Sequence, residues 1–227
     1  MDATILDCAR GCAVGATIGD ALGMPLEFGP RRPLDRLVRE MTPGRLPAGT
    51  FTDDTEMALA LAESLLARRL LDPADLAQRF AAWLRAGPPD VGLHTRDVLS
   101  RIAAGEPWDQ AVKVVQQHKP DSAGNGSVMR CWPVALAHWD DLERLLVDSR
   151  LQSRVTHLHV ECVAGSMLVN AAIFYLLLRG GRDPGGEPGK RRRHGRGGGG
   201  CADRGCLWTG GDPDPVARSA ARRVAPG

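Results

Sequence analysis

The sequence predicts an all-α protein made of several helices, with its functional residues in the loops that join them. Three observations support this fold class. Apolar residues recur at three- and four-residue spacing through most of the first 179 residues, as they do on one face of a helix. Strands, with their alternation of apolar and polar residues, are hard to find there. Helix ends are also marked, as by Asp72 and Pro73 at one start and by Pro88 and Pro89 beyond its stop.

The first helix is expected over residues 5–22, where glycines at every fourth position would let a neighbouring backbone approach closely: Gly11, Gly15 and Gly19. The second helix, residues 56–69, is apolar almost all round and should lie deep in a bundle. A third helix begins at the Asp72–Pro73 cap and continues through Leu84. Further helices are expected over residues 93–103, 107–117, 127–138, 140–151 and 158–178.

The longest apolar run, Cys162–Leu178, contains seventeen uncharged residues. That length is at the short limit for a helix that spans a membrane. The run also contains Gly165, Ser166 and Asn170, which interrupt its apolar character. A buried central helix explains the run better, and no membrane partner is expected.

Composition and charge narrow the class of protein further. A chain of 227 residues, 43% of them apolar, is long enough to bury one substantial core. Its first twelve residues contain three charged side chains instead of the apolar run of a secretion signal. Six cysteines are scattered without a dense framework, as expected of reduced thiols. We therefore expect a cytoplasmic protein.

The stretch GTFTDDTEMALALAESLL opens an otherwise apolar helix with four oxygen-bearing side chains: Thr52, Asp53, Asp54 and Thr55. One interpretation is helix capping, because Asp53 and Glu56 have the spacing of a capping box. The other is a metal site, since two acids and two hydroxyls exceed what one cap requires. Hard oxygen ligands of this kind suit Mg²⁺ or Mn²⁺. Spacing alone favours capping.

Three other stretches contain polar residues that suggest a function, although each also has a simpler structural explanation. In GDALGMPLEF, Glu27 lies on a turn, where an isolated acid is usually just solvated. In SAGNGSVMR, the loop from Asn125 to Ser127 has either the exposed N–H groups that cradle a phosphate or ribose, or an ordinary Asn-Gly turn. In SRVTHLHVEC, His157 precedes a very apolar helix, a position typical of a cap or a packed residue.

Taken in this order, PLEF, FTDDTEMALALAESLL, GNGSVMR and TH before an apolar helix resemble the motifs of the ADP-ribosylglycohydrolase family. The resemblance covers residues 8–179 of an expected but incomplete helical domain, residues 1–179. It implies a single multi-helix orthogonal bundle that carries two Mg²⁺ or Mn²⁺ ions. It also implies hydrolysis of the bond between ADP-ribose C1″ and an acceptor such as arginine or serine. The expected partner is therefore an ADP-ribosylated protein or a small ADP-ribose conjugate.

The family's residue roles, as the resemblance implies them, fall on these motifs. The metal ligands fall on Thr52, Asp53 and Asp54. Glu27 would lie beside the metals as a further ligand or a gate, and with Asp53 and Asp54 it makes up the catalytic group. The loop that holds ribose and diphosphate, and the histidine near the scissile bond, fall on Asn125, Gly126, Ser127 and His157. Glycosidic cleavage passes through an oxocarbenium-like state, for which a metal pair can activate water while an aspartate takes the proton.

After Leu178 the sequence departs from the family's pattern. Residues 180–227 contain fourteen Gly and nine Arg, a composition that predicts a disordered tail or that a shifted reading frame would encode. Within it, TGGDPDPVA resembles a damaged GGDTDT motif at 210–215, which puts Asp212 and Asp214 on the family's last metal ligands. Prolines in place of threonines remove hydroxyl ligands and backbone donors. We therefore expect at most one tightly bound cation and impaired hydrolysis.

Two other classes of function compete with a hydrolase. The first is a protein that binds ADP-ribose without hydrolysing it, which the damaged motif favours. The second is a nucleic-acid-associated protein that uses the basic stretch KRRRHGRGGGG, since residues 180–227 carry ten Lys and Arg against five Asp and Glu. No aromatic residue in that stretch offers a stacking surface for bases. A solvated tail is the simpler explanation, and nucleic acid is not an expected partner.

Overall fold

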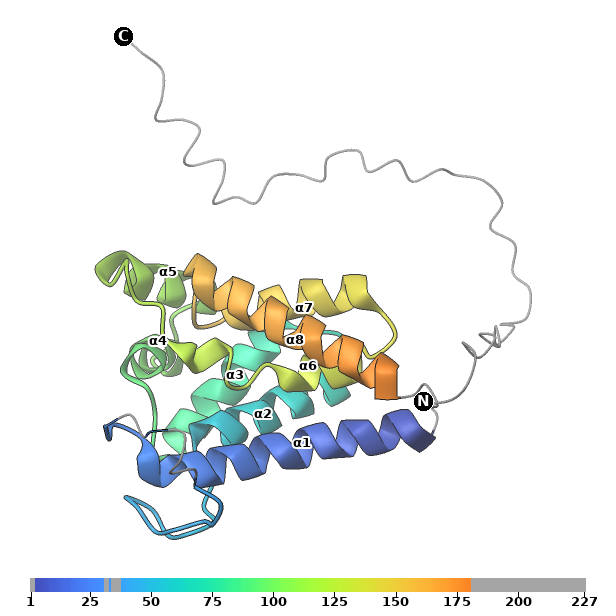
Figure 1. Ribbon diagram of the computed structural model, residues 1–227. Coiled ribbons are helices and arrows are strands. Elements are labelled where there is room, and N and C mark those ends of the chain that lie inside the picture. Colours follow the sequence, from blue (N-terminus) through green and yellow to red (C-terminus); the bar gives the residue numbers. More distant parts are fainter. Residues whose placement is uncertain (1–2, 31–32, 34–37, 181–227) are drawn as a thin grey trace, which may run out of the picture. The chain divides into compact units, whose positions relative to one another are not determined.

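The structure is a computed structural model that describes residues 3–30, 33 and 38–180. Every regular element in these ranges is a helix, which confirms the all-α fold class (Figure 1). The predicted tail, with its 210–215 motif, lies outside the described residues beyond Gly180. The elements are α1 (Ala3–Gly23), η1 (Met24–Leu26), α2 (Asp53–Arg68), α3 (Pro73–Arg85), α4 (Leu93–Ala103), α5 (Trp108–His118), η2 (Asn125–Ser127), α6 (Trp132–Ala137), α7 (Leu142–Arg154) and α8 (Val160–Gly180).

The main hydrophobic core lies where α2 to α5 meet. Figure 1 shows α1, α2 and α8 lengthwise and α4 nearly end-on, so the helices do not all run along one axis. Fully buried side chains fill the core: Met57 and Leu61 of α2, Phe80 of α3, Leu99 of α4 and Val112 of α5. Each such side chain contributes about 1.5–3 kcal/mol to stability by leaving water. The prediction that the second helix lies deep in a bundle is confirmed.

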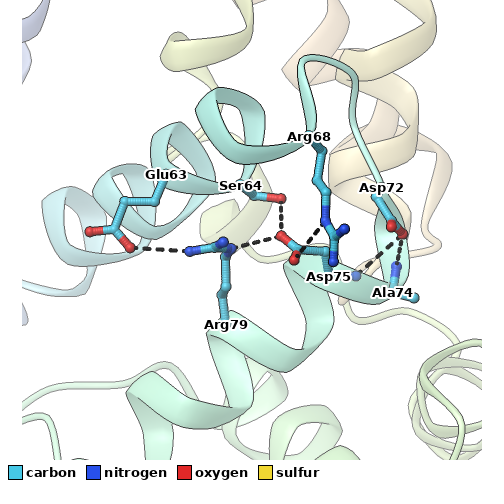
Figure 2. A network of polar contacts seen from close by, with 7 residues as sticks. All are labelled: Glu63, Ser64, Arg68, Asp72, Ala74, Asp75 and Arg79. Atoms are coloured by element: carbon cyan, nitrogen blue, oxygen red, sulfur yellow. Dashed lines mark hydrogen bonds and ion pairs between the residues drawn. The ribbon is translucent and has the colours of Figure 1, made fainter.

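A network of charged residues joins α2 to α3 (Figure 2). Asp75 accepts hydrogen bonds from Ser64 Oγ at 2.7 Å and from Arg68 Nε at 3.1 Å. Arg79, one turn further along α3, donates to Asp75 at 2.7 Å and reaches Glu63 at 3.4 Å. The hydrogen bond from Arg79, followed by those from the other two donors, lowers the pKa of Asp75 to about 2. These contacts fix the start of α3 against the end of α2.

Most predicted helices are found within a few residues of their expected ends. Asp72 is the N-cap of α3 as predicted, and its carboxylate accepts from the backbone N–H of Ala74 at 2.9 Å. The predicted helix over 127–138 is wrong as a single element, because η2 and α6 are separated by a turn. Most backbone bonds there are of the i to i+3 kind instead of a continuous helical ladder. Pro133 also lacks the N–H that a continuous helix would need.

The glycine stripe of α1 does not pack as predicted. Within the part of the chain that the structure describes, no atom outside the local chain lies within 4 Å of the position that a Cβ would take at Gly11, Gly15 or Gly19. Helix α1 instead buries Ile5, Ala9 and Ala21, and its exposed apolar residues are Leu6, Val14 and Ile18. The expectation of a close backbone approach along that stripe is therefore wrong.

Helix α8 is buried along one face only. The residues on that face recur at four- and three-residue spacing: Cys162, Ser166, Asn170, Phe174 and Leu177. Large apolar side chains elsewhere on the helix are exposed: Val160, Leu168, Val169, Tyr175 and Leu176. The prediction of a buried central helix thus holds for one face of α8 and is wrong for the rest of it. Among the described residues, α8 alone is long and apolar enough to cross a membrane, a criterion that core helices also meet.

Candidate active site

A cavity of about 350 Å³ lies beside the N-terminal end of α2. Loops that are far apart in the sequence meet there, and they bring together six of the residues predicted for the site: Glu27, Asp53, Asp54, Asn125, Gly126 and His157. Thr52 and Ser127 are buried next to these residues in the chain but do not line the cavity. Asp212 and Asp214 lie outside the described residues.

Asp20, near the end of α1, holds the first turn of α2 in place. Its carboxylate accepts hydrogen bonds from the backbone N–H and the hydroxyl of Thr52, at 2.9 and 2.7 Å. It also accepts from the N–H and hydroxyl of Thr55, at 3.2 and 2.7 Å. The predicted capping box is wrong, because the N-cap is Thr52 and Glu56 instead accepts from the Trp83 indole at 2.6 Å. A residue from another helix therefore does the capping, which leaves both aspartates free to face the cavity.

We expect Asp20→Ala to lower the free energy of unfolding by about 3 kcal/mol. The change leaves two backbone N–H groups and two nearly buried hydroxyls without their acceptor, and each unsatisfied buried group costs about 1–3 kcal/mol before any water enters. Urea denaturation measures the loss. The control is Asp109→Ala, which removes an exposed ion pair with Lys113 and should cost less than about 1 kcal/mol. Equal losses in the two variants would contradict the capping role of Asp20.

The two aspartates at the start of α2 lie where burial and neighbouring carboxylates disfavour their ionised forms. Burial, and then the neighbouring Asp90 carboxylate, raises the pKa of Asp53 to about 6. Burial, followed by the charges of Asp20 and Asp53, raises the pKa of Asp54 to about 7. A divalent cation would relieve this repulsion, and carboxylate oxygens are the ligands that Mg²⁺ and Mn²⁺ prefer. Within the described ranges, however, no three His, Cys, Asp or Glu side chains converge closely enough to hold a metal.

The rim of the cavity carries a second pair of carboxylates with a guanidinium between them. Glu27 follows η1, and Asp90 lies in the loop before α4. Arg45 forms an ion pair with both, through the same nitrogen. Although partial burial lowers the pKa of Arg45, its hydrogen bonds to Glu27 and Asp90 raise it overall. Phe28 adjoins this group, 93% exposed and with a left-handed φ of 62°, and its ring centroid lies 5.9 Å from the Arg45 guanidinium carbon.

Two stacked histidines form another part of the wall. The rings of His94 and His157 lie 4.6 Å apart with an interplanar angle of 28°. Gly126 packs against them so closely that a Cβ there would lie 2.8 Å from His157 Cε1 and 2.9 Å from Thr95 Oγ1. Only glycine fits this position without a shift of the wall. The Asn-Gly turn of the sequence therefore serves close packing beside the cavity.

Ser127 is fully buried, and its hydroxyl lies within hydrogen-bonding distance of groups on other residues. Its Oγ lies 2.9 Å from Ser153 Oγ, 3.3 Å from Ser166 Oγ and 3.4 Å from the Cys162 carbonyl. Gln152 donates to the Ser127 carbonyl at 2.9 Å. The structure thus gives Ser127 the position of a support that ties the η2 loop to α7 and α8.

Sequence reasoning missed Asp20, Asp90 and Arg45 as members of the site. Asp20 lies seven residues before Glu27, in the same stretch GDALGMPLEF, and its only signal was an acid at the end of an apolar helix. Asp90 and Arg45 had no local pattern that set them apart from ordinary loop charges. Their role becomes visible only when the loops are brought together.

Comparisons with known proteins identify the family of the chain. The family model described as ADP-ribosylglycohydrolase matches residues 1–194. The chain is 37% identical to ADP-ribosyl-[dinitrogen reductase] glycohydrolase of Rhodospirillum rubrum, over 79% of this chain and 60% of the relative. It is 34% identical to the ADP-ribosylarginine hydrolase Tri1 of Serratia proteamaculans, over 81% of this chain and 51% of the relative. A solved ADP-ribosylglycohydrolase-related protein complex superposes with a TM-score of 0.63 at 36% identity, covering 77% of this chain and 57% of that one.

The chain spans between half and 60% of the length of the two curated relatives. The family model nevertheless covers all of the helical part that the structure describes. The all-α fold agrees with that match. The chain is therefore a member of the ADP-ribosylglycohydrolase family.

Proposed function

We propose that this protein hydrolyses the bond between ADP-ribose and the guanidinium of an arginine acceptor, in the cytoplasm. One observation supports the acceptor most directly: at the cavity rim, the carboxylates of Glu27 and Asp90 together bind a guanidinium, that of Arg45. A guanidinium is planar and offers five N–H donors, so two carboxylates can share it. One of the relatives is named an ADP-ribosylarginine hydrolase.

Asp53 and Asp54 would hold a divalent cation, together with the hydroxyl oxygen of Thr52. That hydroxyl gives its proton to Asp20, which leaves its lone pairs available. When bound, Mg²⁺ or Mn²⁺ would orient hydroxyls of the ribose and lower the pKa of a water molecule. A second cation would require the aspartates at 212 and 214, which lie outside the described residues.

Residues of the chain would supply the base, the ligand-binding groups and the contacts to the acceptor. A carboxylate at the start of α2 can take a proton from the attacking water. Asn125 and Gly126 line the cavity beside His157 and would bind the oxygens of the ribose and diphosphate. Glu27 and Asp90 would hold the positively charged acceptor at the rim and favour its departure as a protonated guanidine.

A second candidate function is binding of ADP-ribose without hydrolysis. Among the described residues, no group of three His, Cys, Asp or Glu side chains could hold a metal at the start of α2. A protein of this kind would keep the Asn125 loop and His157 as its binding surface. Calorimetry with ADP-ribose, run beside a turnover assay, separates the two functions.

The proposed acceptor predicts faster hydrolysis of ADP-ribosyl-arginine than of ADP-ribosyl-serine by the full chain with Mn²⁺. Arg45→Ala should lower the KM for the arginine substrate roughly three- to tenfold, because two partly exposed ion pairs no longer compete for the acceptor. The control is Arg101→Ala, which breaks a surface pair with Glu106 away from the cavity. Equal turnover of both substrates, with no effect of Arg45→Ala, would contradict an arginine acceptor. Binding of ADP-ribose without any turnover would favour the second function.

A further inference from the structure

A fully buried arginine stands at the start of a hydrogen-bonded chain that ends at the cavity. Arg130 has no exposed surface, and its guanidinium carbon lies 4.4 Å from the Phe80 ring centroid. It donates to both the side-chain and backbone oxygens of Gln152, at 3.2 and 3.1 Å. Its Nη2 also donates to Thr156 Oγ1 at 2.8 Å. Burial lowers the pKa of Arg130 to about 9, so the group stays charged at neutral pH. A guanidinium has donors only, and every partner must therefore accept.

The Thr156 hydroxyl can donate one hydrogen bond, and the presence of Arg130 limits which group can accept it. Because Arg130 donates to this oxygen and cannot accept, the hydroxyl proton must point to another acceptor. His157 Nδ1 lies 2.8 Å from Thr156 Oγ1. If Nδ1 carried a proton instead, Thr156 Oγ1 would accept from both neighbours, and its own buried proton would have no hydrogen-bond acceptor among the described residues. The hydroxyl therefore donates to Nδ1, which must be unprotonated to accept it.

His157 then has its proton on the other nitrogen. Burial, and then the positive charge of Arg130, lowers the pKa of His157 far below its usual range, so the ring is neutral. With Nδ1 accepting, the remaining proton lies on Nε2. Nε2 is on the side of Gly126, since a Cβ at that glycine would be 3.1 Å away from it, and both residues line the cavity.

Thr156 orients the neighbouring histidine by its carbonyl. His94 Nε2 lies 3.0 Å from the Thr156 carbonyl oxygen, which can only accept, so His94 carries its proton on Nε2. His94 Nδ1 keeps a lone pair and has no partner among the described residues. The two stacked rings are therefore held by one threonine, through different atoms.

We propose that Thr156, held by Arg130, is a positioning residue that fixes His157 as a neutral Nε2–H donor toward the cavity. The ligand group that meets His157 must then be a hydrogen-bond acceptor, such as a phosphate or hydroxyl oxygen. His157 does not act as a general base, because its only free nitrogen already carries the proton. The identification of the ligand as ADP-ribose rests on the proposed function, whereas the tautomer does not.

The test is the histidine tautomer in the full chain, read from long-range ¹H–¹⁵N correlation spectra. His157→Gln identifies the His157 signals by their loss. We expect Nδ1 of His157 to resonate as an unprotonated nitrogen and Nε2 as a protonated one. A protonated Nδ1, or an imidazolium, in the wild-type spectrum at neutral pH would overturn the proposal.

Variants of Thr156 test the positioning role. Thr156→Val keeps the shape but removes the hydroxyl, and should give a mixture of His157 tautomers and an ADP-ribose affinity reduced about three- to tenfold. Thr156→Ser should restore the wild-type spectrum and affinity. Thr17→Val is the control, because it removes a hydroxyl that bonds only within α1. An unchanged tautomer in Thr156→Val would refute the role of Thr156, and if that variant does not fold, a serine variant without the wild-type tautomer would do so.

Titration with ADP-ribose separates this inference from the proposed function. The ¹H signal at Nε2 of His157 should shift on binding, whether or not the chain hydrolyses any substrate. Binding seen by calorimetry without such a shift would overturn the contact between His157 and the ligand. Absence of turnover with the expected tautomer and shift would count against hydrolysis only.

Discussion

Asp54→Asn should weaken Mn²⁺ binding at least about tenfold and reduce hydrolysis by on the order of 10³-fold. The amide keeps the size of the side chain but removes a negative charge where a cation must be held. Helix capping cannot account for such losses, because Asp20 caps α2 and Asp54 makes none of the capping bonds. Calorimetry with Mn²⁺ and a turnover assay measure the two effects.

The same variant should unfold at a higher concentration of urea when no cation is present. The pKa of Asp54 is raised from 3.8 to about 7, which means that the fold disfavours its ionised form; the charge therefore lowers stability increasingly as the pH rises through this range, and fully above it. Replacing it with a neutral amide removes that penalty. Asp97→Asn is the control, since its exposed ion pair with Lys119 should affect neither property. Mn²⁺ binding equal to wild type in Asp54→Asn would refute the ligand role.

Gly126→Ala should reduce ADP-ribose affinity on the order of 100-fold and lower the free energy of unfolding by about 1–3 kcal/mol. The new methyl group would lie less than 3.0 Å from His157 Cε1 and from Thr95 Oγ1. His157 cannot move away easily, because Thr156 and the stacked ring of His94 hold it. Calorimetry with ADP-ribose and urea denaturation provide the measurements.

Gly124→Ala is the control for the predicted loss of stability in Gly126→Ala. A Cβ at Gly124 would meet no atom within 4 Å, and its φ of −66° is allowed for alanine. That variant should be as stable as the wild type. If Gly126→Ala bound ADP-ribose with wild-type affinity, the wall would have to be more adaptable than its packing indicates, and the assignment of the η2 loop to the ligand would be wrong.

Helices could be predicted from the sequence because their signals are local. The helix expected over 93–103 coincides with α4. Its apolar residues recur at helical spacing, and Gly105 follows its last turn. The prediction for the glycines of α1 was wrong because it concerned a contact with another element, which is not a local property. Small residues permit a neighbouring backbone to approach closely, but they do not determine whether one lies there. A run of apolar residues likewise predicted the helix α8 but not that only one face of it is buried.

The site was predictable only as far as its motifs are contiguous. The aspartates of α2 and the Asn125 loop stand out in the sequence because their polar residues are grouped. Asp20 acts on a residue 32 positions away, and Arg130 acts on one 26 positions away. Nothing in their immediate neighbourhood distinguishes them from an ordinary surface acid or base. Such partners become apparent only from the tertiary structure.

The four hydrogen bonds that Asp20 accepts from Thr52 and Thr55 would affect the entropy change of cation binding at the proposed site. With the backbone at the mouth of α2 already ordered by four hydrogen bonds, the peptide units beside Asp53 and Asp54 have little conformational freedom left to lose. Association with a cation therefore requires little further reorganisation of the backbone, and its entropy change should be dominated by water released from the ion. In this sense α1 would preorganise the proposed cation site, although Asp20 itself does not line the cavity.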